Sequence, residues 1–126
     1  MPTQSSRRPT CLLLAITAAI TTSPVFADTG FPDGNYAAGP IVLHFEPSGH
    51  MRLTKDDQVL VDGTFTVQAD RISLTDKSGP MACEKGQETG VYQWKLEHDA
   101  LRLTKVDDVC DGRSGDIVAQ AWKRQR

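Results

Sequence analysis

The chain has 126 residues, of which 14 are Lys or Arg and 16 are Asp or Glu, so its formal net charge at pH 7 is −2 with neutral histidine. The basic residues form no cluster beyond a short KRQR at the C-terminus. This balance argues against a surface that binds nucleic acid or anionic membranes by charge.

Segment 1–27 has the pattern of a secretory signal peptide. Arg7 and Arg8 form a basic n-region, residues 11–20 form an apolar run of h-region length, and the segment ends in Val-Phe-Ala, which fits the small-residue cleavage rule. The apolar run is too short to span about 30 Å of hydrocarbon. We therefore expect export to the periplasm or the extracellular space, and a mature chain of residues 28–126 with no membrane span.

Cleavage would leave two cysteines, Cys83 and Cys110. Two cysteines in an exported chain indicate one disulfide. For a closed loop of about 28 residues, the chain-entropy model gives a stabilisation of roughly 3–4 kcal/mol. We predict this disulfide as a main stabilising feature of a small domain.

The mature chain shows the period of strands and no long helical pattern. Apolar and polar residues alternate with a period of two between turn residues. The predicted strands, in chain order, are 34–39, 41–47, 50–55, 59–67, 71–76, 91–97, 100–105 and 117–122, the last of which alternates poorly. Their connections are short, so consecutive strands should be antiparallel neighbours.

One turn signal, Asp62-Gly63, falls inside the long apolar segment 59–67. It could be a two-residue hairpin turn. We favour a bulge, because a turn there would leave two very short strands and because glycine within a strand often marks a bend.

Eight antiparallel strands with one apolar face each must close into a barrel or split into a sandwich. An even meander with short loops favours the barrel. Trp94 lies between the two cysteines, but the cysteines are too close in sequence for an immunoglobulin sandwich. We predict an all-β, eight-stranded, antiparallel up-and-down barrel with one disulfide.

A series of short motifs runs through most of the mature chain. They are Gly34-x-Tyr36, Gly63-Thr-Phe-Thr-Val, Ile72-Ser-Leu-Thr-Asp76, Gly90-x-Tyr92-x-Trp94, Leu101-x-Leu103 and Asp108-x-Cys110-x-x-Arg113. This series resembles that of small bacterial secreted lipocalin-like (calycin-type) domains. The resemblance implies an eight-stranded barrel with a ligand in or at its mouth, and it supplies no activity.

Four aromatic residues fall on the apolar faces of three predicted strands, namely Phe45, Phe65, Tyr92 and Trp94. The interior of a small barrel is either filled by its own side chains or holds one small ligand. We predict these four residues as the ligand lining, with a filled core as the alternative.

The stretch VDDVCDGRSGD, residues 106–116, combines four acidic residues with a cysteine and an arginine. It does not fit a calcium loop of the EF-hand type, because valine occupies two ligand positions. We predict instead a structural polar cluster of Asp108, Asp111 and Arg113. In it, Arg113 forms a bidentate pair with Asp108 or Asp111 and donates to loop carbonyls.

The sequence offers no motif for metal binding or catalysis. His44 and His50 lie on opposite sides of a turn, without the tight ligand spacing of a zinc site. Both cysteines of the mature chain are assigned to the disulfide, and neither G-x-S-x-G nor a glycine-rich phosphate loop occurs. We expect no metal, no cofactor and no enzymatic activity.

These observations favour an exported, monomeric barrel that binds one small apolar or amphipathic molecule in or at its mouth. The first alternative is a periplasmic protein-binding module, such as an enzyme inhibitor, that acts through the stapled loop around Cys110 on an envelope partner. The second is a structural envelope protein.

Overall fold

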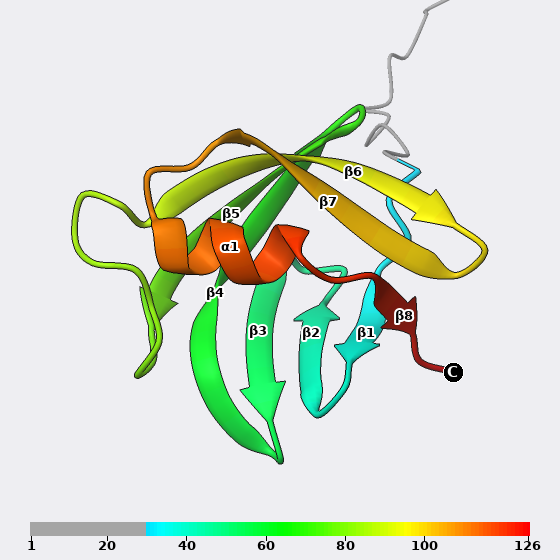
Figure 1. The fold of residues 1–126 in the computed structure, drawn as a ribbon, viewed down its shortest axis with the longest axis horizontal. Helices are drawn as coiled ribbons and strands as arrows, with labels where there is room; N and C mark the ends of the chain where they lie inside the picture. Colours follow the sequence, from blue (N-terminus) through cyan, green and yellow to red (C-terminus); the bar gives the residue numbers. More distant parts are fainter. Residues whose placement is uncertain (1–29) are drawn as a thin grey trace, which may run out of the picture.

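The computed structural model describes residues 30–126, which form a closed barrel of eight strands (Figure 1). The strands are β1 (Gly34–Ala38), β2 (Ile41–Phe45), β3 (His50–Lys55), β4 (Gln58–Gln68), β5 (Arg71–Ser78), β6 (Thr89–Glu97), β7 (Ala100–Asp107) and β8 (Trp122–Arg124). One helix, α1 (Asp111–Val118), connects β7 to β8. The predicted signal peptide, 1–27, lies outside the described residues.

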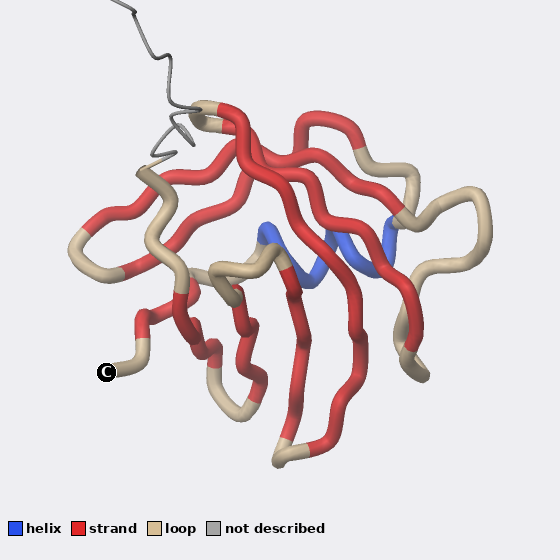
Figure 2. The backbone as a smooth tube through the Cα atoms, turned by 180° about the vertical axis from the view of Figure 1, so that it is seen from behind, coloured by secondary structure: helices blue, strands red, loops and turns tan. Residues whose placement is uncertain are grey.

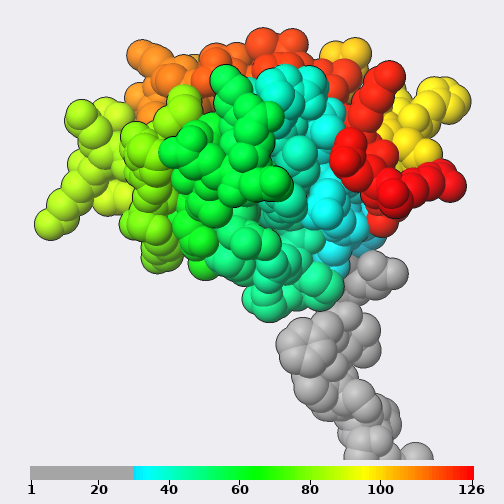
Figure 3. Space-filling model, turned by 90° about the horizontal axis from the view of Figure 1, so that it is seen from below, coloured from blue at the N-terminus to red at the C-terminus, as the bar shows by residue number. Residues whose placement is uncertain are grey.

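Every strand pairs antiparallel with the next one along the chain, and β1 pairs with β8 to close the barrel. Figure 3 shows the C-terminal segment in red beside the first strand in cyan. The predicted eight-stranded antiparallel barrel is therefore confirmed. The predicted disulfide is confirmed as well, since Cys83 and Cys110 are joined by an S–S bond.

The long fourth strand contains the predicted bulge. The β4–β5 register shifts between Asp62 and Gly63, and β4 continues through this point without a turn. A Cβ atom on Gly63 would lie 2.1 Å from the carbonyl oxygen of Thr75. Glycine is thus required here by the close approach of β5, which agrees with the bulge and not with a hairpin turn.

The apolar face of each strand points into the barrel, as the alternation predicts. The buried residues form one continuous core. Its members on the strands are Tyr36, Leu43, Phe45, Met51, Phe65, Ile72, Leu74, Tyr92, Leu101, Leu103 and Trp122, and Phe31 and Ile117 join it from outside the strands.

The predicted last strand, 117–122, is wrong over most of its length. Residues 117 and 118 complete α1, and only Trp122 belongs to β8. The helix buries Ser114 and Ile117, three residues apart on one face, and carries Asp111 in its first turn, where a carboxylate favours the helix dipole. Two glycines and a length of eight residues hide this weak amphipathic pattern from a sequence search.

Helix α1 lies against one side of the barrel. In Figure 1 it crosses in front of the upper parts of β3 and β4 and lies below β7, and in Figure 2 it is seen behind the strands. Strand β8 pairs with only two residues of β7, so the helix takes the place of a longer final strand beside β7. Within residues 30–126, no helix has the length and apolar character needed to cross a membrane.

Candidate functional site

A pocket of about 510 Å³ lies between the barrel and α1. Strands β2 to β5, the β5–β6 loop and the helix all contribute to its wall. The apolar residues that the barrel strands and the helix contribute to the wall are Leu43, Met51, Leu53, Val61, Leu74 and Ile117, and Met81, Ala82 and Val109 line it beside the disulfide. Both the volume and the largely aliphatic wall are typical of sites for small molecules.

The disulfide forms part of the pocket wall and holds its mouth. Cys83 lies in the β5–β6 loop, and Cys110 is the residue that precedes α1. Their Cα atoms are 6.2 Å apart, although 27 positions separate them in sequence. The bond therefore fixes the loop against the start of the helix at the pocket.

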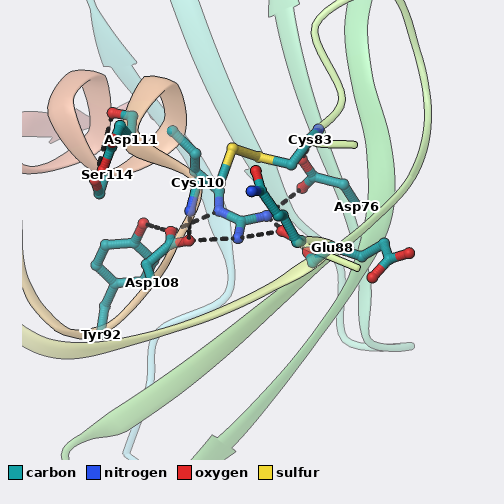
Figure 4. The surroundings of a disulfide bond; sticks show 10 residues. Asp76, Cys83, Glu88, Tyr92, Asp108, Cys110, Asp111 and Ser114 are labelled. Atoms are coloured by element: carbon teal, nitrogen blue, oxygen red, sulfur yellow. Dashed lines mark hydrogen bonds and ion pairs between the residues drawn. A yellow bond between two sulfur atoms is a disulfide. The ribbon is translucent and has the colours of Figure 1, made fainter. Parts of the chain in front are cut away.

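Arg113 lies in the first turn of α1 with only 6% of its side chain exposed. Its Nε and Nη2 atoms donate to the two carboxylate oxygens of Asp108, each at 2.8 Å. Its Nη1 atom lies 3.3 Å from Oδ1 of Asp76. Figure 4 shows Asp76, Asp108 and Tyr92 beside the disulfide, and we call these three residues with Arg113 the arginine cluster.

The same guanidinium also binds the β5–β6 loop. Nη1 donates to the carbonyl of Glu88 at 2.7 Å, and Nη2 donates to the carbonyl of Gln87 at 3.1 Å. Arg113 thus donates four hydrogen bonds within the protein, and its guanidinium also forms an ion pair with Asp76. The carboxylate of Asp76 in turn accepts a hydrogen bond from the backbone N–H of Cys83. The arginine cluster therefore ties the loop to the helix in parallel with the disulfide.

The charges in the arginine cluster stabilise one another. Burial alone would raise the pKa of Asp108, but hydrogen bonds from Arg113, Tyr92 and the backbone of Cys110 outweigh it and lower the pKa. Burial also opposes the charge on Arg113, yet its bonds to Asp108 and the charge of Asp76 keep its pKa above the ordinary value. Burial, assisted by Asp108, raises the pKa of Tyr92, so its hydroxyl stays protonated and donates to Asp108.

Of the predicted polar cluster, the structure brings together Asp108 and Arg113 and leaves Asp111 apart. Asp111 is exposed at the rim of the pocket. Asp76 is the partner that sequence reasoning missed. Its signal is visible in hindsight, because it follows the buried Ile72 and Leu74 at the spacing of two that points a side chain inward.

The four aromatic residues predicted to line a ligand do not line this pocket. Phe45, Phe65 and Trp94 pack around Phe31, with ring centroids 5.1, 5.9 and 5.2 Å from it, respectively. Tyr92 is fully buried and belongs to the arginine cluster. Their role in ligand binding stays a prediction. The aliphatic positions 43, 53, 61 and 74 line the pocket instead, and their pattern in sequence is that of any core.

Two of the three histidines, His44 and His50, take part in side-chain hydrogen bonds on the outside of the barrel. His44 bonds to Asn35 and Thr54, each at 2.8 Å, and His50 bonds to Asp62 at 2.8 Å. Among residues 30–126, no group of three or more histidine, cysteine or acidic side chains is arranged to hold a metal ion.

No protein-family model, no curated protein and no solved structure matches this chain. The functional reasoning therefore depends on the geometry of the pocket.

Proposed function

We propose that this protein is an exported lipocalin-like barrel that binds one small apolar or amphipathic molecule in the pocket beside α1. The observation that carries the proposal is the pocket itself, which combines a volume of about 510 Å³ with an aliphatic wall. Burial of a ligand's apolar surface against this wall would supply roughly 25 cal/mol per Å². Micromolar affinity is therefore within reach of a ligand of modest size.

The frame around the pocket supports the same proposal. A binding site gains affinity when its walls are already ordered, because little conformational entropy is lost on binding. Here the disulfide and the buried Arg113 both hold the β5–β6 loop against α1. Two independent sets of bonds between the loop and the helix favour a pocket that is already formed without ligand over one that collapses when it is empty.

Export is part of this proposal, and the disulfide supports it, since such bonds persist in oxidising compartments. Cell fractionation should place the protein outside the cytoplasm, and N-terminal sequencing of the isolated protein should begin at Asp28. Labelling with a thiol reagent under native conditions should leave Cys83 and Cys110 unmodified until a reductant is added. Cytoplasmic protein with two free thiols would contradict the proposal.

Filling the pocket tests the binding function. Ala82 is half-buried in the pocket wall, so Ala82→Trp should place an indole ring in the binding space. Ala119→Trp is the matched control, because Ala119 is exposed at the end of α1 and does not line the pocket. Nile red fluorescence should show micromolar binding to the wild type and the control, and at least tenfold weaker binding to Ala82→Trp. Equal binding to both variants would place the dye elsewhere.

A second candidate, the protein-binding module, is favoured by two exposed apolar residues at the pocket mouth. Met81 and Val109 are 55% and 61% exposed and lie two residues before Cys83 and one residue before Cys110, respectively. A photoreactive amino acid at position 81 would crosslink a partner in intact cells. A single recurrent crosslinked protein, together with no Nile red binding, would favour this candidate over the small-molecule site.

A further inference from the structure

The polar residues of the pocket carry an unequal charge. Among the described residues that line it, four are acidic and Arg113 is the only basic one. The acidic residues are Asp76, Glu84, Asp111 and Asp116. An aliphatic wall with an acidic mouth is a different environment from a uniformly apolar cavity, and it restricts the head group that a ligand can carry.

Arg113 does not offset this charge for a ligand. Its guanidinium already donates four hydrogen bonds to Asp108 and to the carbonyls of Gln87 and Glu88, and Asp108 and Asp76 compensate its charge. A carboxylate or phosphate head group entering the pocket would have to break these buried bonds, and a buried ion pair that loses a partner is strongly destabilised. An anionic ligand therefore has no cation available at this site.

In contrast to Arg113, the carboxylates of Glu84, Asp111 and Asp116 are not compensated by a partner of opposite charge in the described part of the chain. All three residues are exposed, and none of them takes part in an ion pair within residues 30–126. Glu84 belongs to the β5–β6 loop, while Asp111 and Asp116 belong to α1. They therefore approach the mouth from two elements that the disulfide and Arg113 hold together, and their charges are free to interact with a cation.

We infer that the ligand is an amphipathic cation, with an alkyl or similar apolar body in the aliphatic part of the pocket and an ammonium group at the acidic mouth. The inference rests on the proposed function and narrows its ligand class. Two features carry it together, namely a wall that accepts hydrocarbon and a mouth whose free charges are all negative. A cation without an apolar body would gain only weak, screened attraction to exposed carboxylates.

The test compares ligands that differ only in their head group. Octylamine, octanol and octanoate have the same chain length, and at pH 7 they are cationic, neutral and anionic. Isothermal titration calorimetry with the mature protein should give the tightest binding for octylamine, about tenfold weaker binding for octanol, and the weakest for octanoate, since a few exposed charge contacts supply an effect of this size. Spermidine, a cation without a hydrocarbon tail, should bind far more weakly than octylamine.

A matched pair of variants locates the charge effect. Replacing the mouth carboxylates by Glu84→Gln, Asp111→Asn and Asp116→Asn should weaken octylamine binding and remove the preference for octylamine over octanol. The control changes the same charge away from the pocket, by Asp56→Asn, Asp57→Asn and Glu97→Gln, and should keep the preference.

The outcomes distinguish this inference from the function on which it rests. Octanol and octanoate binding as tightly as octylamine would overturn the cationic ligand class and leave the pocket as a small-molecule site. A preference that persists in the mouth variant, or disappears equally in the control, would also overturn it. Failure of every alkyl probe, together with Nile red, would overturn the proposed function and this inference with it.

Discussion

The two ends of this barrel are built in different ways. Along β4 and β5, Val61 and Asp76 lie at the pocket end, and Phe65 and Ile72 lie farther along the two strands from it, since the antiparallel register pairs Gly63 with Asp76 and Val67 with Ile72. On the next strand, β6, Gly90 is the residue that pairs with Leu74 of β5. We call these the stapled end, which holds the pocket, the disulfide and the arginine cluster, and the aromatic end, which holds Phe31 and the rings around it.

Packed aromatic rings close the aromatic end. Phe31 enters from the segment before β1 and meets Phe45 and Trp94 edge to face, with interplanar angles of 86° in both pairs. Phe45 also packs against Phe65, with ring centroids 5.0 Å apart. Such contacts depend on buried area and shape, and other apolar side chains of similar volume can replace them in part.

The stapled end is held by directional and covalent bonds around a space that side chains do not fill. Its arginine donates hydrogen bonds to the carboxylate of Asp108 and to two carbonyls and forms an ion pair with Asp76, and the disulfide adds a covalent bond. A small barrel can therefore keep a pocket at one end when hydrogen bonds, an ion pair and a disulfide hold that end in place of packed apolar side chains. The two ends should therefore respond differently to conservative substitutions.

The largest expected effect is that of Arg113→Ala. It leaves Asp76 and Asp108 buried without their cation, and the free energy of unfolding should fall by about 3–5 kcal/mol. Arg113→Lys should restore only a small part, because an ammonium cannot form the forked bonds to Asp108 and the loop carbonyls. Urea denaturation of the three proteins measures this series. A lysine variant as stable as the wild type would show that the geometry of the stapled end is not specific.

Phe31→Ala is the corresponding change at the aromatic end, and it should cost about 3 kcal/mol through lost burial and a residual cavity. Phe31→Leu should recover most of this loss, since a leucine keeps much of the apolar volume. The same denaturation experiment therefore tests whether conservative replacement succeeds at one end and fails at the other. Similar recovery for leucine here and lysine at Arg113 would break the comparison.

A smaller effect is expected for Gly90→Ala in β6. An added Cβ atom would lie 2.3 Å from Oδ2 of Asp108 and 2.9 Å from Nη2 of Arg113, so the buried pair must shift, at a cost of about 1–3 kcal/mol. Gly115→Ala is the control, because its Cβ atom would meet nothing within 4 Å on the exposed side of α1. Alanine there should stabilise the helix by about 0.5–1 kcal/mol. Differential scanning calorimetry should show the two melting temperatures moving in opposite directions.

The strands and the inward position of their aromatic residues could be predicted from the sequence, because each depends on a local pattern, whereas the packing of these rings around Phe31 was not predicted. Alternation places Phe45, Phe65 and the other apolar residues on the inner face, and short polar connections dictate the antiparallel order. The bulge at Gly63 could be predicted for the same reason, since two short strands would be a poor alternative to one long strand.

The stapled end was only partly within reach, because its parts come from segments far apart in the chain. Export and cysteine count predict the disulfide, and a short acidic stretch next to Arg113 predicts its pairing with a nearby aspartate. The carbonyls of Gln87 and Glu88, the partner Asp76 and the pocket itself depend on how a loop and a helix meet across the barrel. The helix was hidden because tertiary contacts, and not helix propensity, stabilise its eight residues.

The smallest expected effect is the pH dependence contributed by two histidines on the outer face, whose pKa values are shifted in opposite directions by burial and by hydrogen bonding. Burial, with a contribution from the nearby Arg52, lowers the pKa of His44 below 6.5. The hydrogen bond to Asp62, with further contributions from Glu46, raises the pKa of His50 above 6.5. Protonation of His50 therefore favours the folded state, an effect that is present below the unfolded pKa and is lost as pH rises through the folded pKa. Protonation of His44 has the opposite effect on stability, so its charging at low pH opposes folding.

NMR titration of the imidazole resonances should show His44 titrating at lower pH than His50. Asp62→Asn should bring the pKa of His50 back toward 6.5 and leave His44 unmoved, and a reversed order of titration in the wild type would contradict the assignment.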